Sequence, residues 1–151
     1  MKYYIPPRYF RQEEFVDRAT FILYKGKGWD IWRLFRPQIL FAIYSLRVRY
    51  DKLIRINDWH SGGNFQWRGF RTPDSPQYSV FSQHNGGALD FDVLGMPAEE
   101  VRHDILTHQN DIGIEYIAAV EMSVGGKPIS WVHIDCRNYD RDVNGILQIK
   151  E

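Results

Sequence analysis

The residues from Ser82 to Asp92 bring together a histidine, a tight glycine turn and two aspartates. From residue 88 onward, small and acidic residues alternate with large apolar ones, a period of two that predicts a strand with one packed face and one polar face. Asp90 and Asp92 lie on the polar face, and His84 lies on the turn before the strand. Two carboxylates next to an imidazole are the beginning of a metal site.

A second stretch supplies a further ligand. Residues 131–135 alternate in the same way and put His133 and Asp135 on the face opposite the apolar residues. If the two strands are neighbours in one sheet, His84, Asp90 and His133 can converge on one ion. Two histidines and one carboxylate leave a fourth coordination position open, which is typical of a catalytic zinc site rather than a closed structural one.

The polar residues of both strands need partners. Aspartate is depleted in strands and a buried unpaired carboxylate is costly, so Asp90 requires a metal ion or an arginine. Asp92 has the same parity and is the alternative ligand, unless it is a solvated strand end. His133 and Asp135 taken alone fit a surface-facing polar pair on a hairpin better than a metal site. Unexpected polar residues on both predicted strands, taken together, favour the metal site.

Arg71 lies in the long loop before the motif, where its guanidinium can bind a substrate carboxylate through two hydrogen bonds, or simply face solvent. Cys136 is the single cysteine and therefore excludes an internal disulfide. It has no neighbouring base to activate it as a nucleophile.

The chain has 151 residues, so one domain over 1–151 is expected, with a core that its 44% apolar content can fill. Nineteen basic and nineteen acidic residues cancel, which gives no indication of a nucleic-acid or anionic-membrane partner. No apolar run is long enough to span a membrane. The first residues lack the apolar segment of a signal peptide, so we expect synthesis in the cytoplasm and release by lysis or by another machine.

The pattern predicts an α+β fold with a small, mainly antiparallel sheet and helices packed on one side. Pro37 opens the clearest helix, and Gly and Pro residues mark the breaks between elements. The expected elements are an extended arm over 1–11, a helix over 12–24, a short turn or helix over 29–35, a helix over 37–50, a strand over 53–57, a loop over 58–81, a strand over 88–93, a helix over 97–108, strands over 112–124 and 129–136 joined by a hairpin turn at 125–128, and a polar tail after 137.

Three stretches in order resemble a known family. They are Gly69-Phe70-Arg71-Thr72-Pro73, then Ser82-Gln83-His84 followed by Gly86-x-Ala88-x-Asp90, and Trp131-Val132-His133-Ile134-Asp135. This series is similar to the zinc D-Ala-D-Ala carboxypeptidases and to the related phage L-alanyl-D-glutamate endolysins and murein endopeptidases, which share the hedgehog/DD-peptidase fold. The resemblance covers roughly residues 9 to 137.

The resemblance implies roles for individual residues. Zinc would be bound by His84, Asp90 and His133, while Arg71 would bind the substrate's carboxylate and Ser82 would contact the peptide. The chain departs from the family pattern at two places. Only Asn85 separates His84 from Gly86, where the family has two residues, and Ser130 stands where many members have the acidic general base.

The departure at Ser130 leaves the general base open. Asp135 is the candidate for the base or for the group that orients His133, and Glu121 on the partner strand is the alternative. The expected function is a zinc-dependent peptidase that hydrolyses peptidoglycan stem or cross-link peptides, from a phage or a bacterium, and acts at the cell wall. The alternative is a catalytically inactive, metal-stabilised binding or virion component on the same fold.

Overall fold

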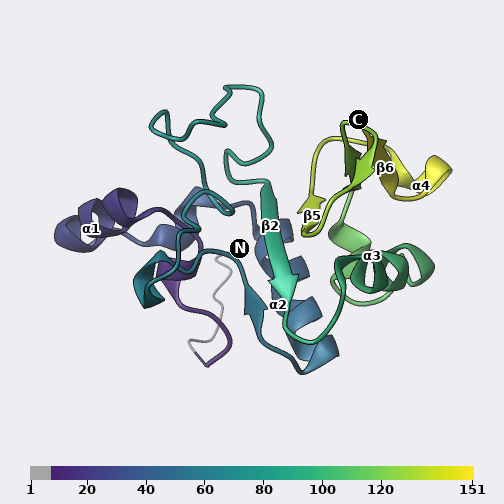
Figure 1. Cartoon of the computed structure of the whole chain (residues 1–151), viewed down its shortest axis with the longest axis horizontal. Helices are drawn as coiled ribbons and strands as arrows, with labels where there is room; N and C mark the ends of the chain where they lie inside the picture. The colour runs from purple at the N-terminus through teal and green to yellow at the C-terminus, as the bar shows by residue number, and fades with distance from the viewer. Residues whose placement is uncertain (1–7) are drawn as a thin grey trace.

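The computed structural model describes residues 8–151 (Figure 1). Most of the extended arm expected over residues 1–11 lies outside the described residues. The helices are α1 (Arg18–Lys27), α2 (Pro37–Tyr50), α3 (Ala98–Thr107) and the short α4 (Arg141–Asn144), and the strands are β1 (Ile54–Arg55), β2 (Ala88–Val93), β3 (Ala119–Val124), β4 (Lys127–Pro128), β5 (Val132–Asp135) and β6 (Leu147–Lys150).

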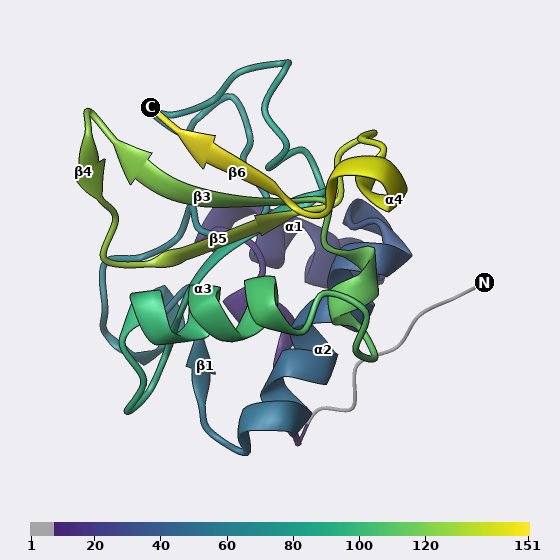
Figure 2. The ribbon, with the colours of Figure 1, turned by 90° about the vertical axis from the view of Figure 1, so that its right-hand side faces the viewer.

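The strands form one sheet in the order β1-β2-β5-β3-β4, and β6 pairs with β3. All pairings are antiparallel except that of β3 with β6. The predicted α+β class with a small, mainly antiparallel sheet is therefore confirmed. Figure 2 shows α2 and α3 on the same side of the sheet.

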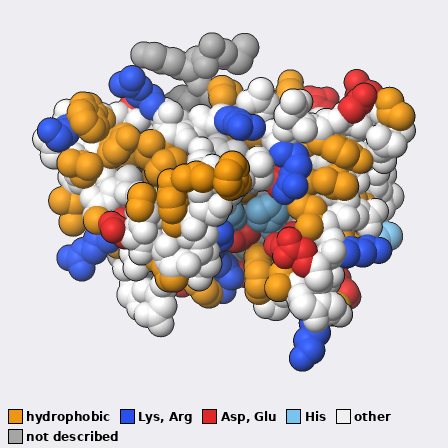
Figure 3. Space-filling view, turned by 90° about the horizontal axis from the view of Figure 1, so that it is seen from above, with side chains coloured by type: hydrophobic (Ala, Val, Ile, Leu, Met, Phe, Trp, Pro, Cys, Tyr) orange, Lys and Arg blue, Asp and Glu red, His pale blue; other side chains and the backbone are white. Residues whose placement is uncertain are grey.

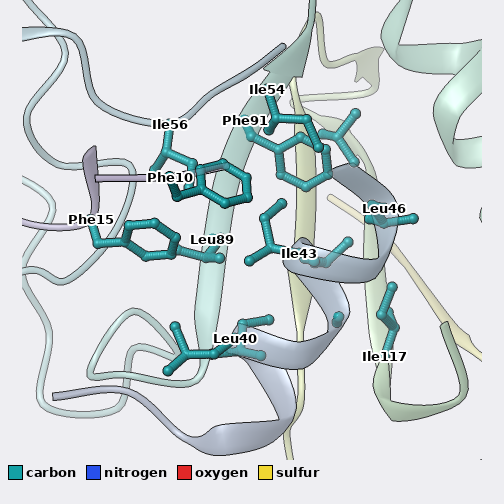
Figure 4. Packing of buried hydrophobic residues seen from close by; sticks show 14 of the residues in the cluster. Phe10, Phe15, Leu40, Ile43, Leu46, Ile54, Ile56, Leu89, Phe91 and Ile117 are labelled. Carbon is teal, nitrogen blue, oxygen red and sulfur yellow. The ribbon is translucent and has the colours of Figure 1, made fainter. Parts of the chain in front are cut away.

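Buried apolar side chains fill the space between α2 and the sheet (Figure 4). Leu89 and Phe91 of β2 point towards Ile43 and Leu46 of α2, as the alternation in the strand requires. The opposite face of β2 carries Asp90. The loop that precedes the strand lies at this face, where Arg68 O accepts a hydrogen bond from Asp90 N–H.

Helix α2 has the predicted bounds. Pro37 is its first residue, where the fixed φ suits the helix and the missing N–H costs no hydrogen bond. Arg47 and Arg49 lie in the last turn, where the helix dipole favours cations. The helix ends at Tyr50, and its C-cap Asp51 has a φ of 48°.

The first helix differs from the prediction over residues 12–24. Only a 3₁₀ turn forms at Gln12–Glu14, because the following Phe15 and Val16 are buried in the core. Asp17 then caps α1, its side chain accepting a hydrogen bond from Thr20 N–H at 3.1 Å. Local capping therefore overrides the apolar periodicity that favoured an earlier start.

The C-terminal third is more segmented than expected. A 3₁₀ turn, Ile114–Tyr116, replaces the first part of the strand predicted over 112–124. The hairpin turn is made by Gly125 and Gly126 alone, with φ values of 59° and 73° that favour glycine. The polar tail after residue 137 adds α4 and β6.

Candidate metal centre

The sheet brings Asp90 and His133 together. Strands β2 and β5 pair antiparallel, and Asp90 lies directly opposite His133 in the register. His133 Nδ1 is 2.7 Å from Asp90 Oδ1. Because directly opposed side chains project from the same face of a sheet, the pairing places both groups on the polar face predicted for each strand.

A tight turn places His84 beside this pair. Ser82 Oγ accepts a hydrogen bond from His84 N–H at 3.1 Å, and Gly87 N–H donates to Gln83 O at 2.8 Å. His84 Nδ1 lies 2.9 Å from Gly69 O. Since a carbonyl oxygen only accepts, that contact places the proton on Nδ1 and leaves Nε2 directed towards Asp90 Oδ2, 3.3 Å away.

Two glycines make this turn possible. A Cβ on Gly69 would lie 2.0 Å from Phe15 O, so only glycine lets the loop carry its carbonyl to His84 there. Gly86 has a φ of 105°, and a Cβ at this position would lie 2.1 Å from Leu34 O. Gly86 O also accepts a hydrogen bond from Arg36 N–H at 2.8 Å. The loop is therefore anchored on the segments before α1 and α2.

His84, Asp90 and His133 are all buried, and each offers one ligand atom within 4.8 Å of the others. Both imidazoles are oriented by a partner outside the cluster: Gly69 O for His84, and Asp135 Oδ2 at 3.1 Å from His133 Nε2. Metal-binding histidines usually have such a partner on their second nitrogen. The three residues predicted as ligands therefore form a group that could hold a metal ion.

The protonation of the cluster is unusual. Burial lowers the pKa of His133, but hydrogen bonds with Asp135 and Asp90 outweigh it and raise the pKa to about 9. Burial raises the pKa of Asp90, but hydrogen bonds with His133 and His84 hold it well below its usual range. Without a metal ion, the proton on His133 compensates the charge of the carboxylates around it.

Asp135 is fully buried and contacts Nε2 of His133, the ring nitrogen that does not face Asp90. Its carboxylate accepts two hydrogen bonds from the Arg137 guanidinium, with Nε at 2.8 Å from Oδ1. Burial raises the pKa of Asp135, but the bonds with Arg137 and His133 lower it overall. Sequence reasoning missed Arg137, although it follows Asp135 by two residues.

The cluster lies at an open cleft. Figure 3 shows histidine side chains recessed at the centre of this face, among acidic, basic and apolar side chains. The cleft is lined by His84, Asp90 and His133 together with Arg71, Phe81, Ser82, Gln83, Glu121, Trp131, Arg137, Ile149 and Glu151. Asp135 does not line it.

Glu121 is a carboxylate of the cleft that lies outside the cluster, as is Glu151. Burial raises its pKa, as do the charges of Asp90 and Glu151, against the opposing effect of His133. A carboxyl group with a raised pKa at the edge of a candidate metal centre is suited to accept and return a proton.

Arg71 lines the cleft but is already engaged. Its Nη2 donates to Asp90 Oδ2 at 3.0 Å and its Nε donates to Trp67 O at 2.8 Å. Burial lowers the pKa of the guanidinium, while the charges of Asp90 and Glu121 oppose this effect. The structure thus places Arg71 as a partner of the Asp90 carboxylate.

Asp92, the alternative ligand, is placed outside the cluster. Its Oδ2 is 2.6 Å from Arg68 Nη1 and 2.8 Å from Arg55 Nη2. Parity alone did not distinguish it from Asp90. The arginines that pair with Asp92 come from β1 and from the long loop, and neither position was predictable from the motif.

Comparison of the chain with protein-family models, with curated proteins and with solved structures finds no match. Over residues 8–151, no helix combines the length and the apolar character that a membrane span requires.

Proposed function

We propose that this chain is a zinc-dependent peptidase that acts on peptidoglycan stem or cross-link peptides, with the hedgehog/DD-peptidase fold. The observation that carries the proposal is the buried group of His84, Asp90 and His133 at an open cleft. The three stretches of the family resemblance contribute to this one cleft, through Arg71, His84 and His133. Release by lysis would bring the protein to the cell wall.

The donor set fits zinc. His84 Nε2, His133 Nδ1 and an Asp90 oxygen are the atoms left facing one another once the outer contacts of the imidazoles are assigned. A nitrogen-rich set of three protein ligands is typical of catalytic zinc. Zinc bound there supplies a Lewis acid that polarises a carbonyl and lowers the pKa of water.

Glu121 is the general base in this proposal. It lines the cleft and has a raised pKa, so it can take the proton from the attacking water and deliver it to the leaving amine. Asp135 was the first candidate for this role. Because Arg137 and His133 occupy its buried carboxylate, we assign Asp135 the orientation of His133 instead.

Arg71 and Ser82 form the substrate side of the cleft. Arg71 Nη1 has no hydrogen bond to another described residue, so it can donate to a substrate carboxylate while Nη2 holds Asp90. The Ser82 hydroxyl accepts from His84 N–H, and its own proton is available for a peptide carbonyl.

The test is to measure zinc per chain and the cleavage of purified muropeptides by mass spectrometry, for the wild type and for His84→Ala. We expect one zinc per chain and cleavage in the wild type, and loss of both in the variant. His60→Ala, which removes an exposed histidine outside the cluster, is the control.

One observation favours the second candidate, a non-catalytic metal-stabilised binding component. Arg71 is bound to Asp90, which ties the expected substrate-binding group into the metal cluster itself. Stoichiometric zinc without cleavage of any muropeptide would support this role and contradict the peptidase. A chain that stays metal-free in saturating zinc would contradict both.

A further inference from the structure

Helix α1 turns an apolar stripe away from the protein. Ala19, Ile22, Leu23 and Gly26 follow the spacing i, i+3, i+4, i+7 and are all exposed. The exposed fractions of Ile22 and Leu23 are 59% and 50%. This spacing normally marks the face that a helix buries against a core. In α1 the described residues leave this stripe uncovered, while Phe21 and Tyr24 on the other side of the helix pack against the core.

Basic residues surround the stripe. Arg18, Lys25 and Lys27 belong to α1, Arg33 follows nearby, and all four are exposed. Between residues 18 and 33 the only acidic residue is Asp30, so four positive charges less one negative charge give +3. The stretch is therefore locally basic in a chain whose net charge is zero.

Trp29 follows the helix directly. It is 47% exposed, and its ring packs edge-on against Tyr24 at 5.3 Å between centroids. Lys27 Nζ lies 5.2 Å from the centre of the indole ring. Figure 1 shows α1 at one end of the molecule, and apolar and basic side chains gather at this end in Figure 3.

We propose that α1 with Trp29 is a docking surface for an anionic lipid bilayer, with the helix lying in the plane of the interface. An exposed apolar stripe flanked by lysine and arginine, next to a tryptophan, is the composition of interfacial helices. The stripe enters the boundary between headgroups and acyl chains, and the basic side chains reach the anionic headgroups. This surface is separate from the metal centre and does not depend on its function.

The charge of the surface argues against two other occupants. In a twofold dimer the same patch meets itself, so two surfaces of charge +3 would face each other. A soluble polyanion would use the basic residues but leave Ile22 and Leu23 in water. A bilayer with anionic headgroups uses both kinds of side chain.

The test is co-sedimentation of the full chain with vesicles. One set contains equal parts of phosphatidylglycerol and phosphatidylcholine, and the other contains phosphatidylcholine alone. We expect binding to the anionic vesicles at low salt, with weaker binding to the neutral ones. Each basic residue near an anionic surface contributes about fivefold, so Lys25→Gln with Lys27→Gln should weaken binding roughly 25-fold.

Ile22→Ser with Leu23→Ser should abolish the binding that survives in high salt, since that part comes from the apolar stripe. Matched controls are Lys52→Gln with Lys150→Gln, and Ile112→Ser with Val143→Ser, which change exposed residues of the same types elsewhere. These controls should bind like the wild type, and all variants should keep the wild-type affinity for zinc.

Absence of binding to the anionic vesicles would overturn the proposal. Equal binding by the Ile22/Leu23 variant, with full competition by soluble polyphosphate, would show a polyanion surface instead. Sedimentation equilibrium showing a dimer that depends on Leu23 would show a contact between copies and would also overturn it.

Discussion

The candidate metal centre has a sheet half and a loop half, which are held in different ways. Asp90 and His133 face each other across the β2–β5 ladder, so backbone hydrogen bonds fix their spacing. His84 and Arg71 belong to the long segment between β1 and β2, which has little regular structure. Their positions depend on single contacts, such as the carbonyl of Gly69 and the Ser82 cap.

This difference shows where such a centre tolerates change. A shift of one residue in a strand would turn Asp90 to the apolar face, because side chains alternate with a period of two. One residue fewer between His84 and Gly86 changes only the turn, where Gly86 provides a backbone conformation that favours glycine. The shortened turn between His84 and Gly86 thus falls in the half that can absorb it.

The comparison predicts unequal effects of removing either histidine. His133 contacts two buried carboxylates, whereas His84 contacts one carboxylate and one carbonyl. In the metal-free protein, His133→Ala should lower the free energy of unfolding by about 3 kcal/mol, because it leaves buried charge without its partner. His84→Ala should cost about 1.5 kcal/mol. Urea denaturation in the presence of a chelator measures both.

His60→Ala is the control, since this histidine is exposed and outside the cluster. Both cluster variants should lose the zinc-dependent rise in the unfolding midpoint that a bound ion produces. Equal losses of stability for His84→Ala and His133→Ala would contradict the distinction between the two halves.

Arg137 tests whether a residue outside the strands also holds the sheet half of the centre in place. Arg137→Gln removes the clamp on Asp135, which then holds His133 less firmly. Loss of such an outer partner typically lowers metal affinity by about 10- to 100-fold, and we expect an effect in this range from zinc competition with a chelator.

A matched substitution separates this effect from the loss of any arginine–aspartate pair. Arg55→Gln breaks a contact with Asp92 outside the cluster and should leave zinc affinity unchanged. An Arg137→Gln protein with wild-type affinity and a wild-type cobalt(II) absorption spectrum would show that Asp135 needs no clamp.

In the loop half, Gly69→Ala is the corresponding change. The new Cβ overlaps Phe15 O, so the loop must shift and carry its carbonyl away from His84. We expect a cost of about 1–2 kcal/mol in the free energy of unfolding, in the lower part of the range for overpacking because a loop can relax. Gly26→Ala in α1, where no atom lies within 4 Å, should be neutral or stabilising. Equal behaviour of the two variants would mean that Gly69 is not a fixed contact.

The two halves also differ in how far the sequence predicts them. Alternation within residues 88–93 and 131–135 places Asp90 and His133 on polar strand faces, and the observed register agrees with that parity. Asp92 has the same parity, and only the positions of Arg55 and Arg68 decide that it lies elsewhere. The alternation of side chains is a local property of the sequence. Which of the two aspartates joins the cluster depends on tertiary contacts.

The loop half was identified by motif rather than by position. The contact of Gly69 with Phe15 and the engagement of Arg71 by Asp90 join residues far apart in the chain, and no local pattern encodes them. The uncovered face of α1 is the converse case. Its spacing predicts a helix that packs its apolar side, and only the fold shows that nothing in the described residues covers that stripe.

The cluster should also respond to pH. His133 has a pKa raised from 6.5 to about 9, so its proton stabilises the metal-free protein fully below pH 6.5, and this contribution is lost as the pH rises through 9. Zinc binding to Nδ1 must displace that proton, so the apparent affinity for zinc should rise about tenfold per pH unit between pH 7 and 8.5. The unfolding midpoint of the metal-free protein should therefore fall over the same interval in which zinc stabilises more. An affinity for zinc that does not change between pH 7 and 8.5 would mean that His133 is already neutral, and that Asp90 and Asp135 hold it without a second proton on the ring.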